Sequence, residues 1–332
     1  IATLVVGHNT MALLLLPLLV VYAGMTKKLD MMLPIVLGVA VAAFFWMPAL
    51  LERAYVWVDA VAVAKPWEYF LTGGWLGLAN PVVLSACVLV LFGQKKRASG
   101  MGVLAVASII VTLFTTSLAS FLWHIDIFGK LIQFPYRLLA ITTLFGPWLI
   151  ATAATSLSMK RLFTVAWIIL WFVPVARMLP AIVYTNQPEG FYTTNEATTT
   201  VADEYMPRWV REKPTRRAET KVEFIAGRGE IRSSQATGRH IKATVNALEH
   251  STVQINTVYY PGWGIQIDGA PAPFTYDNPM GLMQVEVPQG THTLYVDFRE
   301  TVLRFAADIV TMTALLLYIG IAFRSFLAKR TS

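Results

Sequence analysis

The chain has 332 residues, of which 55% are hydrophobic and 14% are charged, and its mean hydropathy is +0.54. A soluble domain carries roughly 25% charged residues. The composition therefore excludes an ordinary soluble enzyme and a disordered chain, and it indicates an integral membrane protein. The single cysteine, Cys87, excludes an intramolecular disulfide and a cysteine-rich metal site.

The net charge of +7 is unevenly distributed along the chain. Residues 185–300 hold 11 Lys and Arg against 14 Asp and Glu, a net charge of −3, and the remainder holds 16 against 6, a net charge of +10. The positive excess lies among the apolar segments, where it marks membrane topology. We therefore expect no nucleic-acid partner.

Seven apolar stretches have, or nearly have, the roughly 20 residues that a helix needs to cross the hydrocarbon layer. They are residues 3–25, 33–51, 76–92, 101–123, 138–157, 162–184 and 302–323. No basic segment or small-residue cleavage site precedes the first stretch, and we expect the chain to be the C-terminal part of a longer protein.

The short loops predict the orientation of these helices. Lys and Arg gather after the first, third, fifth and seventh stretches, at residues 27–28, 95–97, 160–161 and 324–330. Cytoplasmic loops are enriched in these residues. The alternate connections, residues 52–75, 124–137 and 185–301, are therefore predicted to face outward in a multi-pass protein of the plasma membrane.

Residues 185–300 change to short, alternating, β-branched segments separated by turn signals. The predicted strands are residues 221–225, 230–233, 241–246, 252–259, 264–267, 282–287 and 293–298. The fold class is therefore a membrane all-α bundle of about seven transmembrane helices with an extracytoplasmic antiparallel β-sandwich inserted before the last helix. The predicted domains are the bundle of six helices (1–184), the sandwich (185–300), and the last helix with its basic cytoplasmic tail (301–332).

Two carboxylates at the predicted outer ends of helices are candidate catalytic groups. Glu52 is a candidate general base or metal ligand, with an ion pair to Arg53 or another cation as the alternative. Asp126, two residues after His124, is a candidate for proton relay or metal binding, with a solvated loop as the alternative. A divalent cation, Mg²⁺ or Mn²⁺, is the candidate cofactor.

The candidate substrate-binding residues are polar or aromatic: His8, Asn9, His124, Arg137 and Trp263. Arg137 follows Pro135 at a helix start, where a guanidinium can bind phosphate; the alternative is an arginine that anchors the helix at the headgroups. His8 and Asn9 stand at the edge of an apolar helix, where polar residues are costly, with a helix cap as the alternative. Trp263 is a candidate platform for a sugar, or else part of the sandwich core.

Several short motifs carry a resemblance to known families. His-Asn-Thr-Met-Ala-Leu-Leu-Leu-Leu-Pro at 8–17, Phe-Trp-Met-Pro-Ala-Leu-Leu-Glu at 45–52 and Gln-Phe-Pro-Tyr-Arg at 133–137 resemble the membrane proteins labelled 6-pyruvoyl-tetrahydropterin synthase-related. Tyr-Tyr-Pro-Gly-Trp-Gly-Ile-Gln-Ile-Asp-Gly at 259–269, followed by Pro-Gln-Gly-Thr-His at 288–292, resembles the YfhO-type membrane proteins. Both groups are similar to the GT-C superfamily of polytopic glycosyltransferases.

The resemblance implies sugar transfer from a polyprenyl-phosphate donor to an envelope glycan, lipid or protein acceptor at the outer face of the membrane. It also implies a catalytic acidic residue in the first outward loop, which we expect upstream of Ile1. The expected partners are the lipid-linked donor, the acceptor and membrane lipids. The alternatives are a non-catalytic scaffold or carrier of envelope glycans and, third, a transporter, which the uncharged helices 33–51 and 101–123 disfavour.

Overall fold

The protein is described by a computed structural model. It covers residues 1–58, 62–71, 79–93, 100–155, 161, 164–166, 168–169, 172, 176, 186–190, 203–215 and 218–330. The chain divides into two compact units. The first comprises Ile1–Ala43, Val61–Asn186 and Thr311–Ser332, and the second comprises Phe44–Ala60 and Gln187–Val310.

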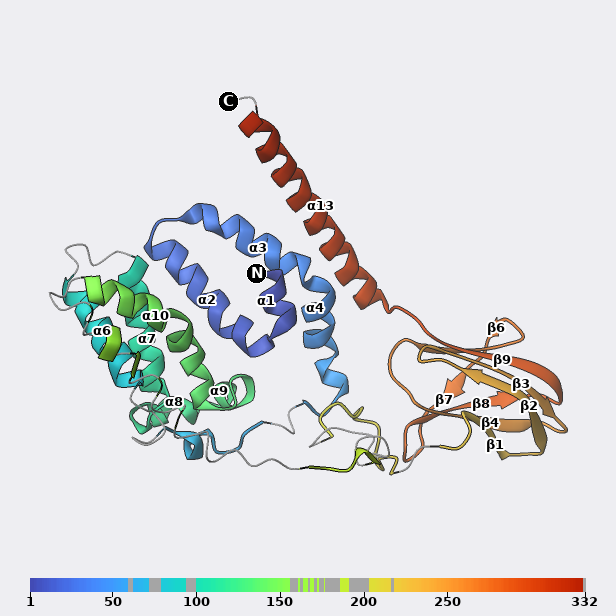
Figure 1. The fold of residues 1–332 in the computed structure, drawn as a ribbon. Coiled ribbons are helices and arrows are strands. Elements are labelled where there is room, and N and C mark those ends of the chain that lie inside the picture. The colour runs from blue at the N-terminus through green and yellow to red at the C-terminus, as the bar shows by residue number, and fades with distance from the viewer. Residues whose placement is uncertain are drawn as a thin grey trace. The chain divides into compact units, whose positions relative to one another are not determined.

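The first unit is helical. Its longer helices are α2 (Asn9–Met25), α3 (Met32–Val41), α6 (Ala79–Gly93), α7 (Gly100–Phe114) and α10 (Leu139–Thr155), with α1 (Ala2–Gly7) and η1 (Leu29–Met31) before α2 and α3. Helices α6, α7 and α10 lie together (Figure 1) and share one apolar core, in which Cys87, Ala105 and Leu149 are fully buried. Small side chains at such contacts let helix backbones approach closely.

Short helices cover one end of this group. They are η4 (Pro66–Tyr69), η5 (Ser117–Ala119), α8 (Ser120–Trp123), α9 (Asp126–Leu131) and η6 (Pro135–Leu138). Trp123, Ile132 and Leu138 form a second buried cluster beneath them. This end of the helical unit holds most of the candidate site residues of the unit.

Three of the predicted helices are interrupted. The stretch 3–25 is broken at His8, whose backbone is extended, and the stretch 33–51 is broken at Ala42 between α3 and α4 (Ala43–Leu51). The stretch 101–123 bends by 85° after Phe114. There the hydroxyls of Thr115 and Thr116 donate to the carbonyls of Thr112 and Leu113 and compete with the helical backbone.

Within the described residues, two helices are long and apolar enough to cross a membrane, Pro135–Thr155 and Val302–Ala328. The number rises to four if the segments on either side of Ala42, and those on either side of the bend after Phe114, each form one span. The predicted stretch 76–92 corresponds to α6. The predicted stretch 162–184 lies outside the described residues except at isolated positions.

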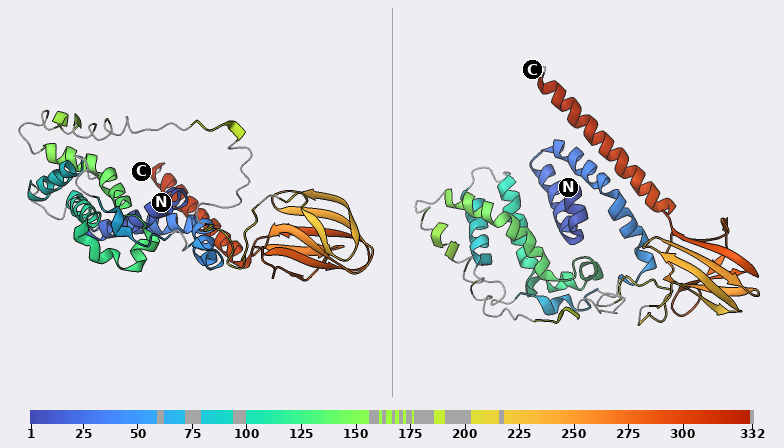
Figure 2. Two further views of the ribbon diagram at one scale, coloured as in Figure 1. Left: turned by 90° about the horizontal axis from the view of Figure 1, so that it is seen from below. Right: turned by 45° about the vertical axis from the view of Figure 1, so that its right-hand side comes forward.

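The second unit contains two antiparallel sheets, seen as two layers of strands in Figure 2. The first has the order β1 (Val222–Ala226), β4 (Ser251–Val258), β8 (Leu282–Val287), β7 (Phe274–Thr275). The second has the order β2 (Gly229–Ala236), β3 (His240–Ala247), β9 (Gly290–Phe298), β5 (Trp263–Ile267), β6 (Ala270–Pro271). Buried side chains of both sheets form one hydrophobic core.

Alternation in the sequence explains why these segments form strands. Along β4, Val253 and Ile255 are buried in the core, whereas Gln254 lies between them on the opposite face. All seven predicted strands are confirmed to within a few residues. The two-residue strands β6 and β7 were not predicted, because two residues are too few to show a period.

The last element is helix α13 (Val302–Arg330), which is separated from the end of β9 by three residues. It is the long apolar helix predicted after the strands. Its first residues, up to Val310, belong to the second unit together with most of α4 and all of η2 (Glu52–Tyr55).

Candidate functional site

A small recess of about 190 Å³ lies where the short helices meet in the first unit. Residues of the segment 62–67 line one side, and Trp123, His124, Asp126, Gly129 and Lys130 line the other. The rings of Trp67 and His124 stack, with their centroids 4.6 Å apart and their planes 7° apart. His124 is oriented by a 2.8 Å hydrogen bond between its Nδ1 and the carbonyl of Ser120.

Two charged side chains of α9 stand at this recess. The ammonium of Lys130 lies 3.5 Å from a carboxylate oxygen of Asp126, one helical turn away. The Asp126 side chain is 86% exposed and that of Lys130 is 48% exposed, and an exposed pair of this kind holds its partners weakly. Both groups are therefore free to contact a polar ligand.

Close packing fixes the walls of the recess. The Trp123 indole is buried and donates to the carbonyl of Phe114 at 2.8 Å. A Cβ atom at Gly129 would lie 3.2 Å from both the Pro66 ring and the carbonyl oxygen of Val63. A glycine at this position lets the segment before η4 approach α9.

Arg137 lies in η6, at the start of α10. Its Nη1 donates to the side-chain oxygen of Gln133 at 2.7 Å and to the carbonyl of Ile132 at 3.2 Å, and the guanidinium lies 5.1 Å from the centre of the Phe134 ring. No carboxylate among the described residues pairs with it. Its positive charge is therefore not neutralised by the part of the chain that the structure describes.

His8 and Asn9 begin helix α2. The Nδ1 of His8 accepts a hydrogen bond from the backbone N–H of Met11 at 3.4 Å, so His8 is the N-cap, and Asn9 is the first helical residue. The helix cap, which was the alternative interpretation of His8, is therefore present. A role for either residue in substrate binding stays a prediction.

Glu52 lies in the second unit and is 7% exposed. Its two carboxylate oxygens accept from Nε and Nη2 of Arg304 at 2.9 and 2.8 Å, and one of them also accepts from the Tyr260 hydroxyl at 3.2 Å. Burial and the nearby carboxylate of Glu52 raise the pKa of Tyr260 to about 12, so Tyr260 remains a donor at neutral pH. Arg304 also lies over the Phe298 ring at 4.9 Å.

This arrangement gives Glu52 a partner that the sequence did not identify. Arg304 lies in the first turn of α13, and a cation at an apolar helix needs a carboxylate or a headgroup as its partner. Arg304 and Glu52 are 252 residues apart in the chain, so the sequence alone does not show that Glu52 is the partner of Arg304. The catalytic role of Glu52 stays a prediction. Both of its carboxylate oxygens already accept hydrogen bonds from Arg304, and one also accepts from Tyr260.

Trp263 opens strand β5 and is half-buried. Its ring meets Phe298 edge-on, with centroids 5.3 Å apart, and packs against the sandwich core. This position corresponds to the core alternative given above for Trp263.

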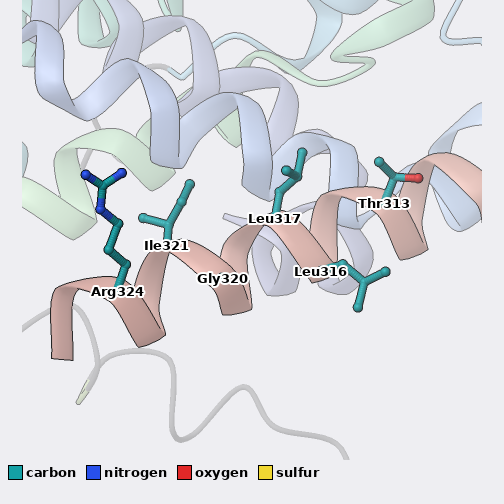
Figure 3. Close-up of a pocket in the computed structure, with 6 residues that line it drawn as sticks. All are labelled: Thr313, Leu316, Leu317, Gly320, Ile321 and Arg324. Atoms are coloured by element: carbon teal, nitrogen blue, oxygen red, sulfur yellow. The ribbon is translucent and has the colours of Figure 1, made fainter. Parts of the chain in front are cut away.

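Two further features limit what these sites can hold. Among the described residues, no group of three His, Cys, Asp or Glu side chains is placed to hold a metal ion. A second, open recess is lined only by one helix, α13, from Thr313 to Arg324 (Figure 3). It is the apolar face of a candidate membrane span, and Arg324 is the one charged group that lines it.

Comparison with known proteins gave no match: neither a family model nor a curated protein matches this sequence.

Proposed function

We propose that the chain is part of a membrane glycosyltransferase of the GT-C type, which takes a sugar from a polyprenyl-phosphate donor at the outer face of the plasma membrane. The observation that carries the proposal is the recess of Trp67, His124, Asp126 and Lys130. An aromatic face, a cation and an accessible carboxylate are the three kinds of group that a sugar phosphate and its acceptor require.

Each group has a part in the proposed reaction. The sugar ring lies against the indole of Trp67, and the ammonium of Lys130 and the guanidinium of Arg137 stabilise the phosphate of the donor. Asp126 accepts the proton of the acceptor hydroxyl as its oxygen forms a bond to the anomeric carbon. The bond from that carbon to the phosphate oxygen breaks, and polyprenyl phosphate leaves.

The proposed topology places this recess and the strands in one compartment. Seven membrane helices, with the Lys- and Arg-rich loops in the cytoplasm, put the segment between α7 and α10, which carries Asp126 and Arg137, outside. The resemblance of the short motifs to GT-C proteins supports the same topology. The sandwich is proposed to hold the acceptor.

The experiment compares Asp126→Asn with the unaltered protein in proteoliposomes that contain a labelled polyprenyl-phosphate sugar. We expect transfer to fall by about 10²-fold or more, the usual contribution of a general base. Asp277→Asn is the matched control, because Asp277 is an exposed carboxylate of the second unit that pairs with Arg211 at 3.3 Å. Equal transfer by Asp126→Asn and Asp277→Asn removes Asp126 from the proposed site.

The alternative is a non-catalytic scaffold or carrier for envelope glycans. One observation favours it: Glu52, one of the two predicted catalytic carboxylates, is occupied by Arg304 and Tyr260. A scaffold binds the lipid-linked sugar in the same proteoliposomes and leaves it uncleaved. Uptake of the sugar into the vesicles without transfer indicates a transporter, and loss of transfer in EDTA indicates that the divalent cation is required.

A further inference from the structure

The junction between the sandwich and the last helix is short and rigid. Phe298 ends β9 and Val302 begins α13, so the link spans at most about 14 Å when fully extended. The backbone N–H of Arg299 donates to the carbonyl of Gly262 at 2.8 Å, and the Thr301 hydroxyl caps the N–H of Arg304 at 3.3 Å. A Cβ atom at Gly262 would lie 2.7 Å from the Arg299 carbonyl oxygen.

The apolar surface of α13 starts at its first turn. Val302 is 88% exposed and Phe305 is 61% exposed, and both belong to the candidate span Val302–Ala328. The headgroup region on each side of the hydrocarbon layer is about 5 to 8 Å thick. The Phe298 end of the sandwich is therefore held at, or immediately above, the headgroups of the bilayer that α13 enters.

A patch of rings and one arginine lies at this junction. We call Tyr55, Trp57, Tyr205 and Arg208 the aromatic collar; all four are exposed. Two backbone hydrogen bonds hold its segments together: Trp57 N–H donates to Met206 at 3.3 Å, and Arg208 N–H donates to Tyr55 at 2.9 Å. The Arg208 guanidinium lies 5.1 Å from the centre of the Trp57 ring.

The collar is continuous with the ion pair at the start of α13. The ring of Tyr55 meets that of Tyr260 edge-on, at 6.1 Å between centroids, and the Tyr260 hydroxyl donates to Glu52. Glu52 in turn pairs with Arg304, in the first turn of α13. These contacts fix the exposed rings at the junction between the sandwich and α13. The same junction determines how far the sandwich lies from the bilayer that α13 is proposed to cross.

We propose that the aromatic collar is a membrane-binding surface that inserts into the lipid headgroup layer, with Arg208 contacting lipid phosphate. Tyr and Trp rings are enriched at this depth because they present an apolar body and a polar tip. The side chain of Arg208 supplies the positive charge that lipid phosphates attract. The surface keeps the sandwich lying on the bilayer, and it does so whether or not the protein transfers sugar.

The experiment uses the single native cysteine of the chain. In a Cys87→Ala background, a fluorescent NBD probe is attached to one new cysteine, at Trp57→Cys, Tyr205→Cys or Glu249→Cys. The full chain is placed in phospholipid vesicles that carry TEMPO nitroxide quenchers on the lipid headgroups. Glu249 is the control, since it lies in the turn before β4, near the Gly290 end of β9. Phe298, at the other end of β9, is eight residues from Gly290, which corresponds to about 26 Å along the strand.

We expect the headgroup quenchers to reduce the emission of probes 57 and 205 at least twofold more than that of probe 249. Arg208→Gln should lessen the quenching at position 205 in anionic vesicles. Equal quenching at positions 205 and 249 overturns the proposal. So does protection of position 205 that appears only when a second protein is added, because the surface then binds protein and not lipid.

Discussion

At the scale of single residues, the ion pair of Glu52 and Arg304 joins α13 to the short helix η2 in the second unit. Both side chains are largely buried, at 9% and 15% exposure. Removing two charges from water is costly, and the cost is recovered only when the geometry is good and the remaining oxygens accept hydrogen bonds. The two short bonds to Arg304 and the third from Tyr260 meet that condition.

The substitution Glu52→Gln should therefore destabilise the fold. It leaves the guanidinium of Arg304 buried without a countercharge, which costs about 3 to 5 kcal/mol in the free energy of unfolding. Denaturant titration of the purified protein, followed by tryptophan fluorescence, measures this change. The double variant Glu52→Gln with Arg304→Gln should lose less than the sum of the two single losses.

The matched comparison is the exposed pair of Arg211 and Asp277. Asp277→Asn should change the same free energy by less than about 1 kcal/mol, because water screens that pair. Equal losses at Glu52 and Asp277 would show that the buried pair contributes no more than a surface one.

Single residues also show which parts of the candidate site are predictable from the sequence. Spacing identified His124 and Asp126, because polar residues at the end of an apolar stretch stand out. It did not bring Trp67 to His124, or Tyr260 to Glu52, because those partners meet only when distant segments pack. The sequence pattern predicts which polar residues lie near the ends of apolar helices. Which of these residues contact one another depends on how distant segments pack.

At the scale of secondary structure, the strands were predictable and the helix interruptions were not. A strand shows its buried face as a two-residue alternation, and β8 has the predicted bounds, Leu282–Val287. An apolar stretch in a membrane protein is hydrophobic on every side, so its composition is the same across a break as within a helix. The break at Ala42 therefore leaves little trace in the hydropathy of the sequence. At His8 the polar side chain gave a helix cap as one interpretation, but residues 3–25 were still predicted as one helix.

The turn between β5 and β6 makes the stability of the sandwich depend on acid pH. Asp268 adopts a positive φ of 51°, and its oxygens accept from the backbone N–H of Thr293 and the Nδ1 of His292, both at 2.7 Å. The Thr293 bond first, and the His292 bond second, hold the pKa of Asp268 below its ordinary value of 3.8. A hydrogen bond from His240 similarly lowers the pKa of Asp297.

A carboxyl group with a lowered pKa stabilises the folded state above its ordinary pKa and loses that contribution as the pH falls through the lower, folded-state value. The unfolding midpoint should therefore fall as the pH is lowered below about 4. Asp268→Asn should lower the unfolding midpoint near neutral pH. It should also reduce the fall of the midpoint at acid pH, because the protonation of Asp268 no longer contributes to that fall. Thermal unfolding measured by fluorescence between about pH 6 and pH 2.5 tests this.

Glu230→Gln, at an exposed position of β2, is the control for a change of one charge in the same sandwich. If Asp268→Asn and Glu230→Gln give the same midpoints at every pH, the hydrogen bonds of Asp268 do not contribute to the acid dependence.

At the scale of the whole molecule, composition predicts membrane insertion, and the charge of the loops predicts orientation. Among the described residues, the structure has two to four helices that are long and apolar enough to cross a membrane. Helix α13 alone provides 27 residues, about 40 Å of helix, more than the roughly 30 Å of the hydrocarbon layer. The orientation rests on the cations at positions 27–28, 95–97, 160–161 and 324–330, and it stays a prediction.

Cysteine labelling of intact cells tests this orientation directly. In the Cys87→Ala background, a membrane-impermeant maleimide should react with Glu249→Cys in the strand-rich unit without permeabilisation. It should react with Lys28→Cys, in the loop after α2, only after the membrane is permeabilised, because basic loops are retained in the cytoplasm. Both positions are exposed, so access to the label depends on the membrane and not on packing. Labelling of both positions from the same side contradicts the topology and separates the sandwich from the outer compartment in which sugar transfer is proposed.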